Sequence, residues 1–146
     1  KKNFRTSDVD ICVKVRQLLN VAPFAKNIVQ PDEQFGALRA AGNPIVDDYW
    51  SLVIRDIHSA CDVFSKVYDQ SQGVDGYVSV EVDPGLAHDG PGTEAAARQL
   101  HERINRRNLM VKIPGTEEGL APVEQMIAEG RSINVTLIFS LDRYSK

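Results

Sequence analysis

The sequence is poor in cysteine and in long apolar runs, and each shortage excludes a class of protein. Its 146 residues include two cysteines, Cys12 and Cys61, which lie far apart and form no Cys-x-x-Cys pair. The two could form a disulfide, but a reduced cytoplasmic protein is the better interpretation. No apolar run approaches the roughly 18 residues of a membrane-spanning helix, and the N-terminus lacks the apolar core of a signal peptide. The sequence therefore predicts a soluble cytoplasmic protein with no membrane partner.

Net charge is also low, at −3, and basic and acidic residues are interspersed along the chain. Because a nucleic-acid-binding surface needs a basic patch or stripe, no nucleic-acid partner is expected. The three histidines show no metal-ligand spacing, so surface or packing roles and no metal or other cofactor are expected. With 42% apolar and 25% charged residues, the composition predicts one globular domain with a substantial core.

From about residue 32 onward the sequence alternates between helical and strand patterns. Helical spacing of apolar residues covers 32–41, 45–69, 93–107 and a stretch that ends at Gly130. Runs rich in β-branched residues cover 77–83, 109–113 and 133–139. This alternation predicts an α/β protein built from βαβ units with a parallel sheet. Residues 1–31 fit no single pattern, and the sequence stops inside a helix that begins at Ser140, which suggests a truncated chain.

Lys112 interrupts the apolar run 109–113, one of the expected strands. A lysine is seldom fully buried unless it has a partner or a chemical role. Burial disfavours the ammonium form, which lowers a lysine pKa and makes the free amine a usable nucleophile. The position therefore suggests Schiff-base chemistry, although a lone strand lysine is more often an edge residue whose ammonium group reaches water.

Polar residues recur at the same parity on all three expected strands. Side chains two apart on a strand share a face. Each expected strand therefore has a polar face, which carries Glu81 on the first strand, Lys112 on the second, and Asn134 with Thr136 on the third. Three strands that direct polar groups to one space are typical of the interior and mouth of an (α/β) barrel. An amine, a carboxylate, an amide and a hydroxyl are the groups that a class I aldolase needs. Taken singly, Glu81 would be an ion-pair partner of the lysine, and the other two would be hydrogen-bonding core residues.

Other polar or aromatic residues near these strands have simpler interpretations. Asp83 precedes a proline and is expected to lie at a strand end or in a loop. Thr116, Glu117 and Glu118 are expected to cap the following helix. Trp50 belongs to the apolar face of the long helix and is expected in the core.

Three ordered segments, 76–84, 108–116 and 133–140, resemble the transaldolase family in its bacterial longer-chain form. They read Gly-Tyr-Val-Ser-Val-Glu-Val-Asp-Pro, Asn-Leu-Met-Val-Lys-Ile-Pro-Gly-Thr and Ile-Asn-Val-Thr-Leu-Ile-Phe-Ser. The resemblance covers about residues 32–146 and implies a (β/α)8 barrel of the TIM-barrel type. It also implies transfer of a dihydroxyacetone unit in the non-oxidative pentose phosphate pathway. The donor would be sedoheptulose 7-phosphate or fructose 6-phosphate, and the acceptor an aldose phosphate.

The resemblance further implies a role for each polar strand residue. Lys112, on the fourth strand, would form the Schiff base with the substrate. Glu81, on the third strand, would act as acid and base through a bound water. Asn134 and Thr136, on the fifth strand, would bind the dihydroxyacetone hydroxyls and position that water. The substrates would be sugar phosphates, and no cofactor is implied.

The chain also departs from the family pattern. The first-strand aspartate and the second-strand Thr-x-Asn-Pro motif have no clear counterpart in residues 1–31, and the later serine and phosphate-binding arginines would lie beyond Lys146. The expected organisation is an uncertain segment over 1–31 and a partial barrel domain over 32–146, which supplies about strands three to five. Two alternatives follow: a class I aldolase similar to fructose-6-phosphate aldolase, or an inactive truncated remnant that only binds sugar phosphate or a partner. The polypeptide of 146 residues alone is expected to be inactive.

Overall fold

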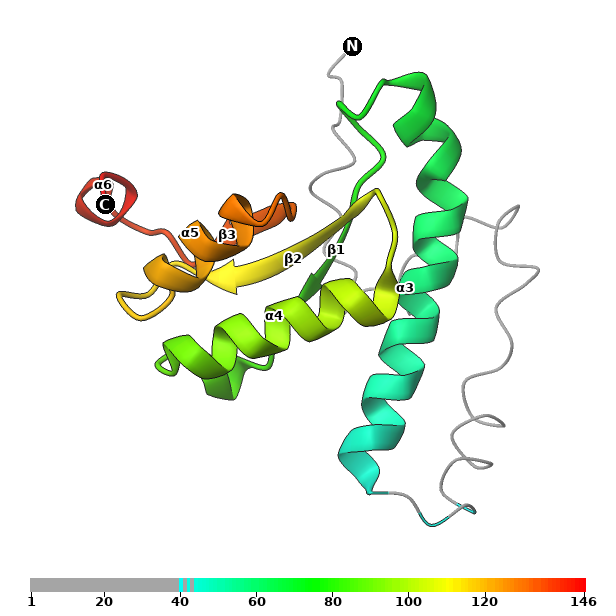
Figure 1. Ribbon diagram of the computed structural model, residues 1–146, viewed down its shortest axis with the longest axis horizontal. Helices are drawn as coiled ribbons and strands as arrows, with labels where there is room; N and C mark the ends of the chain where they lie inside the picture. The colour runs from blue at the N-terminus through cyan, green and yellow to red at the C-terminus, as the bar shows by residue number, and fades with distance from the viewer. Residues whose placement is uncertain (1–39, 41, 43) are drawn as a thin grey trace.

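The computed structural model describes residues 40, 42 and 44–146, and all structural statements below concern these residues (Figure 1). Four helices and three strands, with one short 3-10 helix, follow one another in the order α3 (Ile45–Gln70), β1 (Val78–Glu81), η4 (Pro84–Leu86), α4 (Gly90–Ile104), β2 (Leu109–Pro114), α5 (Leu120–Ala128), β3 (Ile133–Thr136) and α6 (Leu141–Tyr144). The expected segment 1–31 and, apart from Ala40, the expected helix 32–41 lie outside the described residues.

The three strands form one parallel sheet in the order β1-β2-β3, as the alternation of patterns predicts. The helices α4 and α5 make the two crossovers, so the described chain consists of consecutive βαβ units. In Figure 1, α4 runs alongside β2, and α6 lies apart from the sheet at the end of the chain. None of the helices in this part of the chain is long and apolar enough to cross a membrane.

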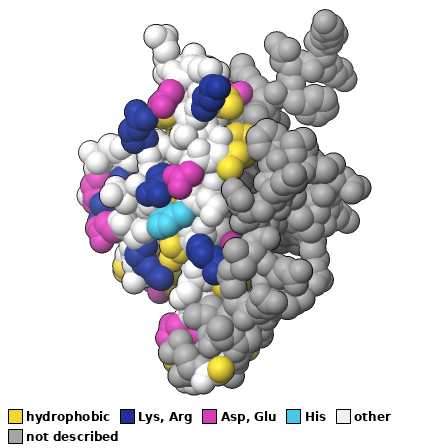
Figure 2. All heavy atoms as spheres, turned by 90° about the vertical axis from the view of Figure 1, so that its right-hand side faces the viewer, with side chains coloured by type: hydrophobic (Ala, Val, Ile, Leu, Met, Phe, Trp, Pro, Cys, Tyr) yellow, Lys and Arg dark blue, Asp and Glu magenta, His cyan; other side chains and the backbone are white. Residues whose placement is uncertain are grey.

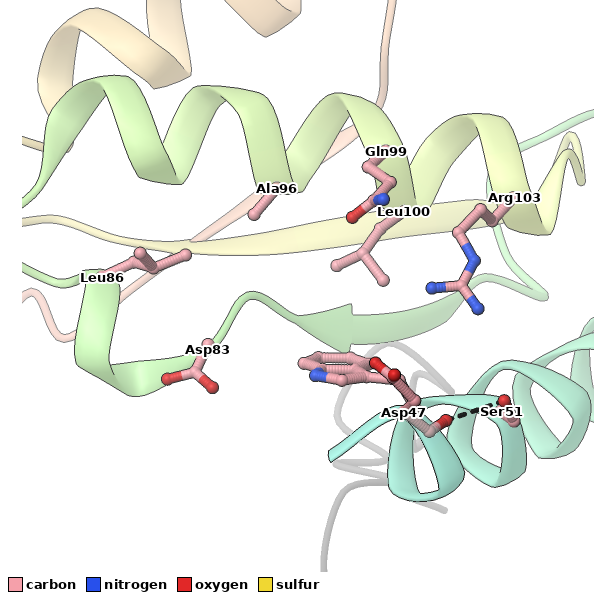
Figure 3. A pocket seen from close by; sticks show the side chains of 9 residues that line it. Asp47, Ser51, Asp83, Leu86, Ala96, Gln99, Leu100 and Arg103 are labelled. Carbon is pink, nitrogen blue, oxygen red and sulfur yellow. Dashed lines mark hydrogen bonds between the residues drawn. The ribbon is translucent and has the colours of Figure 1, made fainter. Parts of the chain in front are cut away.

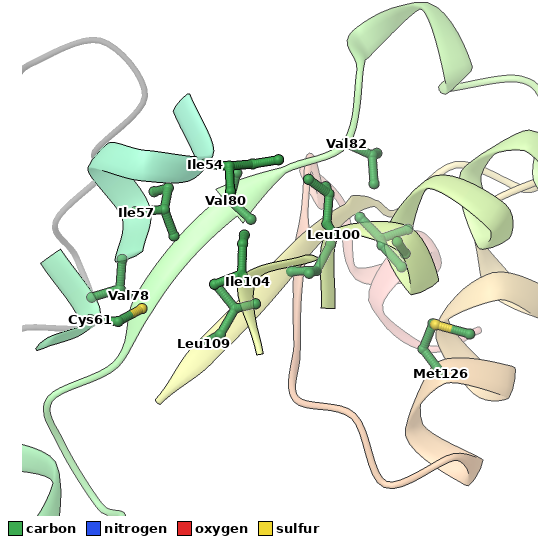
Figure 4. Packing of buried hydrophobic residues seen from close by; sticks show 13 residues of the cluster. Ile54, Ile57, Cys61, Val78, Val80, Val82, Leu100, Ile104, Leu109 and Met126 are labelled. Carbon is green, nitrogen blue, oxygen red and sulfur yellow. The ribbon is translucent and has the colours of Figure 1, made fainter. Parts of the chain in front are cut away.

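One face of the sheet is apolar and is covered by helices (Figure 4). Alternate residues of β1 and β2, with the residue that follows β1, are at most 2% exposed: Val78, Val80, Val82, Leu109, Val111 and Ile113. They pack against buried residues of α3, α4 and α5: Ile54, Ile57, Cys61, Ala97, Leu100, Ile104 and Met126. Trp50 packs partly buried against this cluster, as its place on the helix face predicts. Because strand side chains alternate, the polar residues of the same strands point to the opposite face.

Asn108 joins the long helix to the start of the sheet. Its buried side-chain amide donates to the carbonyl oxygens of Cys61 and Gly76, at 2.9 and 3.0 Å. Gly76 has φ +86°, and a Cβ there would collide with the backbone nitrogen of Tyr68. Glycine therefore allows the turn after α3 to approach the helix closely before β1 begins.

The structure corrects the expected ends of several elements. β1 ends at Glu81, not at residue 83, because Asp83 caps η4 by accepting from the backbone nitrogen of Gly85 at 2.7 Å. α4 begins at Gly90, not at residue 93, because Asp89 caps it, and it ends at Ile104, because Asn105 adopts the left-handed conformation.

The third strand is also shorter than expected. It ends at Thr136, not at residue 139, since Leu137 has φ +61° and leaves the extended conformation. Phe139, which a strand pattern would place beside the sheet, is 87% exposed. The β-branched and apolar composition of this run predicts a strand, but the left-handed residue ends the ladder.

Candidate active site

Lys112 is buried in the central strand of the sheet, with 7% of its surface exposed. Its neighbours in sequence, Val111 and Ile113, belong to the apolar core, so Lys112 points to the face that the helices do not cover. The expectation of a buried lysine within an apolar strand is met. An edge position with an ammonium group in water does not describe this residue, because β2 lies between β1 and β3.

Strand pairing places three of the predicted residues in one row. Glu81 of β1 pairs with Lys112 of β2, and Lys112 pairs with Asn134 of β3. Partners in register on parallel strands direct their side chains to the same face. The Lys112 Nζ atom lies 3.5 Å from Glu81 Oε2, and the two side chains are 9% and 33% exposed. A carboxylate thus neutralises much of the cost of burying the ammonium group.

Thr136 completes the cluster from the end of β3. Its hydroxyl lies 3.2 Å from Glu81 Oε1, to which it can donate, and 3.5 Å from the carbonyl oxygen of Ile113. The two oxygens of Glu81 therefore face different partners, Lys112 on one side and Thr136 on the other. Two residues from two neighbouring strands thus converge on the carboxylate of Glu81.

This arrangement has the parts of an amine-based carbonyl chemistry. A lysine amine must lose a proton before it attacks a carbonyl, and Glu81 is placed to accept a proton from Lys112 directly or through a water. Thr136 can pass a hydroxyl proton or orient a water beside the same carboxylate. Asn134, half-buried in the same row, offers an amide to a hydroxylated substrate. Among the described residues, no group of histidine, cysteine and acidic side chains could hold a metal ion.

The expected helix caps have a different role. α5 begins after Gly119 without a side-chain cap, so the prediction for Thr116, Glu117 and Glu118 is wrong as stated. Thr116 bonds to Ala87 and Gly119, Glu117 pairs with Arg143 and Lys146, and Glu118 pairs with His88. These contacts join loops at the carboxyl ends of the strands. Sequence reasoning missed them because all partners except Gly119 lie 26 to 30 residues away, and only a local capping pattern was visible.

The other histidines have packing roles, as expected. His58 Nε2 lies 3.2 Å from the carbonyl oxygen of Arg103, which links α3 to α4. His101 is half-buried in α4, and burial together with the charge of Arg131 lowers its pKa.

A separate hollow of about 380 Å³ lies between α3, η4 and α4 (Figure 3). Asp47, Asp83 and Arg103 line it, with Trp50 and Leu86 among its apolar residues. Its walls come from the helices and from η4, whereas Lys112 points to the sheet face opposite the described helices. The hollow is therefore distinct from the Lys112 cluster.

The outer surface of the helices carries mixed charge. Figure 2 shows basic and acidic side chains interspersed over the described part of one face. Two ion pairs join α3 to the residues that follow α4: Arg106 with Asp62 and Arg107 with Asp69, both at 2.8 Å. The Arg106 guanidinium lowers the pKa of Asp62 by a direct hydrogen bond.

Comparison with known proteins adds the family context. A model of the transaldolase/fructose-6-phosphate aldolase family matches residues 21–146. Transaldolase 2 of Nostoc punctiforme is 54% identical over 104 residues, which cover 71% of this chain and 27% of that protein. Transaldolase of Saccharopolyspora erythraea is 48% identical over 128 residues, or 86% of this chain and 34% of that protein. Transaldolase of Frankia alni is 41% identical over 151 residues, which cover 99% of this chain and 41% of the length of that protein. The chain thus spans less than half of the length of these relatives.

Proposed function

Because the chain belongs to the transaldolase/fructose-6-phosphate aldolase family, we propose that the protein that carries it transfers a dihydroxyacetone unit between sugar phosphates. The fold of this family is a (β/α)8 barrel, and the three parallel strands with their helices are part of such a barrel, as expected from the sequence. The donor is a ketose phosphate and the acceptor an aldose phosphate, in the non-oxidative pentose phosphate pathway.

The proposed reaction begins at Lys112. Its neutral amine adds to the carbonyl carbon of the ketose, and loss of water gives an iminium ion. Glu81 takes the proton from the amine and returns a proton to the departing hydroxyl, directly or through a water next to Thr136. A base then takes the proton of the hydroxyl on the leaving carbon, which becomes an aldehyde. The electron pair of the breaking carbon–carbon bond moves into the iminium group, so an aldose phosphate leaves and an enamine remains on Lys112.

The second half of the reaction reverses these steps with a new aldehyde. The enamine carbon attacks the acceptor carbonyl, which forms a new carbon–carbon bond and restores the iminium ion. Water then releases the product ketose and the free amine. The enamine must be kept from water between the two halves, which the interior of a closed barrel favours. Asn134 would hold the hydroxyls of the three-carbon unit from the row that it shares with Lys112.

One observation carries this proposal: a buried lysine lies 3.5 Å from a carboxylate that a threonine hydroxyl also contacts. A purely structural ion pair would explain the lysine and the carboxylate. It would not require a hydroxyl on the other carboxylate oxygen and an amide at the paired position of the next strand.

The test is to trap the Schiff base. Incubation with fructose 6-phosphate and borohydride should attach the reduced three- or six-carbon adduct to Lys112, as read by peptide mass spectrometry. Lys112→Met should abolish the adduct, whereas Lys66→Met, at an exposed position on α3, should leave it unchanged. Glu81→Gln should lower the rate of transfer by about 100-fold, since it removes an acid–base group of nearly the same size. An unmodified Lys112 in the folded wild-type protein would refute the proposal.

The second candidate function is cleavage to free dihydroxyacetone, because the matching family model covers fructose-6-phosphate aldolase as well as transaldolase. The two functions differ in the acceptor. A transaldolase releases the three-carbon unit only onto an aldose phosphate, so free dihydroxyacetone should stay low when no acceptor is added. Accumulation of free dihydroxyacetone from fructose 6-phosphate alone would favour the aldolase.

We also propose a cytoplasmic location, which the free thiol of buried Cys61 fits.

A further inference from the structure

The loop after β2 fastens the carboxyl ends of all three strands to one another. We name residues 115–119 the rim segment. Thr116 connects it to the loop after β1: its hydroxyl donates to the carbonyl oxygen of Ala87 at 2.6 Å and accepts from the backbone nitrogen of Gly119 at 3.1 Å. The Thr116 side chain is half-buried, and neither Ala87 nor Gly119 belongs to the buried apolar cluster.

The rim segment also contacts the end of β3. The backbone nitrogen of Gly115 donates to the carbonyl oxygen of Thr136 at 2.6 Å. A Cβ on Gly115 would lie 3.0 Å from that oxygen and 3.0 Å from Ile138 Cγ1, so a larger residue would push the two segments apart. The residue whose hydroxyl meets Glu81 is thus held at its own backbone by the rim segment.

Charged side chains repeat the same connections at the surface. Glu118 Oε2 lies 3.2 Å from His88 Nδ1, beside Ala87 in the loop after β1. Glu117 Oε2 lies 2.9 Å from Arg143 Nη1 and 2.9 Å from Lys146 Nζ, in and just after α6. Lys146 and then Arg143 lower the pKa of Glu117. Because these pairs are largely exposed and screened, the hydroxyl of Thr116 is the stronger tie between the loops after β1 and β2.

We propose that Thr116 is a positioning residue for the transfer reaction, with Glu118 as a weaker second tie between the same two loops. The inference rests on the proposed function. Glu81 and Lys112 lie at the same register on β1 and β2, and their separation follows the relative position of the two strand ends. At 3.5 Å, Nζ and Oε2 lie just beyond the range of about 2.6–3.2 Å for a direct proton transfer, so a small displacement decides whether the proton moves directly or through a water. Thr116 limits that displacement through Ala87.

Thr116→Val tests this role because valine has nearly the same shape and lacks the hydroxyl. In the protein that carries this chain, kcat for transfer should fall by about tenfold, while KM for the ketose stays within about twofold. Borohydride should still label Lys112. Thr116→Ser restores a hydroxyl and should bring kcat back to within about twofold of the wild type.

Thr93→Val is the matched control. The Thr93 hydroxyl donates to the carbonyl oxygen of Leu86 at 2.8 Å, so the same substitution removes the same kind of bond one residue away. This bond joins α4 to η4 and does not involve the rim segment, so kcat should be unchanged while the unfolding temperature falls. Equal kcat values for the folded Thr116→Val and Thr93→Val variants would overturn the inference, as would a failure of Thr116→Ser to restore kcat.

Glu118→Gln keeps the inference falsifiable if Thr116→Val does not fold. The side chain is 42% exposed, so folding should tolerate the change, and kcat should fall by about threefold with KM unchanged. No change in kcat for this variant would overturn the inference in that case. If the wild-type protein transfers and is labelled at Lys112 but the variants match it, only this inference fails. If the wild type is not labelled, the proposed function fails first.

Discussion

Lys112 is a charged residue in an otherwise apolar strand, and the parallel sheet forms around it without a gap in its apolar core. The ammonium group replaces an apolar side chain on the face opposite the core, so it displaces none of the apolar packing of Val111 and Ile113. Glu81, in register on the next strand, supplies the opposite charge at 3.5 Å. A buried ion pair of this kind contributes little net stability compared with apolar residues of similar volume. The pair therefore contributes little to folding, which agrees with the chemical role proposed for Lys112.

His101 gives a prediction on pH at the scale of a single residue. Burial, with the nearby charge of Arg131, lowers its pKa in the folded protein, and its Nε2 atom is buried with no hydrogen-bond partner among the described residues. The unfolded chain binds the proton more tightly, at a pKa of about 6.5. The contribution of His101 to stability is thus complete above about pH 6.5 and is lost as the pH falls toward the lower folded pKa.

Substitution His101→Leu removes both the titration and the buried polar atom. The difference in unfolding free energy between pH 7.5 and pH 5 should therefore be smaller for the variant than for the wild type. Urea denaturation at the two pH values measures this difference, and the other titrating groups cancel in the comparison. Parallel loss of stability in both proteins would show that His101 is not responsible.

At the scale of the elements, Asn108 is a buried polar link at the amino ends of the strands. It connects α3, through Cys61, and the turn at Gly76 to the start of β2. Asn108→Leu preserves the volume but removes two buried donors, so the unfolding free energy should fall by about 2–4 kcal/mol. Gln125→Leu, in which an exposed amide loses its bond to Glu129, should change it by less than about 0.5 kcal/mol. Equal effects in urea denaturation would contradict the assigned role of Asn108.

The sequence predicted the elements best where periodicity alone determines them. The apolar spacing over 45–69 predicted α3, which runs from Ile45 to Gln70, because an amphipathic helix of this length repeats its signal over seven turns. Short elements gave fewer repeats, so their ends were wrong. The helical spacing began only at residue 93, after the Gly-Pro-Gly start of α4. The left-handed conformation of Leu137 has no signature in the apolar run around it.

In the candidate site, too, the sequence predicted the features that follow a local rule and missed the contacts between distant residues. Parity on three strands predicted that Glu81, Lys112, Asn134 and Thr136 share a face, because strand alternation is a local rule that pairing in register extends across the sheet. The bond from Thr116 to Ala87 spans 29 residues, and the pair of Glu117 with Arg143 spans 26. Such contacts depend on how the loops meet after the sheet has formed. No local pattern encodes them.

At the scale of the whole molecule, the helices that cover the described sheet all pack on one face of it, and the polar row lies on the opposite face. Helices α3, α4 and α5 bury the apolar face, as in the outer layer of a (β/α) barrel. The polar row of Glu81, Lys112 and Asn134 lies on the inner face, where the strands of a closed barrel would surround it. The chemistry proposed for Lys112 would therefore depend on strands besides these three.

A polypeptide confined to these 146 residues should consequently show no transfer. A barrel of this kind needs about 250 residues and eight strands to enclose its interior, and without closure water reaches the enamine on Lys112. The first-strand aspartate of the family also has no clear counterpart in the sequence. A coupled assay that follows the released aldose phosphate measures the rate, and appreciable transfer by this polypeptide would refute the prediction.

The matched control places the same residues in a complete barrel. Residues 44–146 would replace the corresponding segment of the Frankia alni transaldolase, which is 41% identical to this chain. Because Lys112, Glu81 and Thr136 bring their mutual contacts with them, the chimaera should transfer, and Lys112→Met in the chimaera should abolish both transfer and borohydride labelling. A folded chimaera without activity would show that the three strands of this chain lack a working site even when the barrel around them is closed.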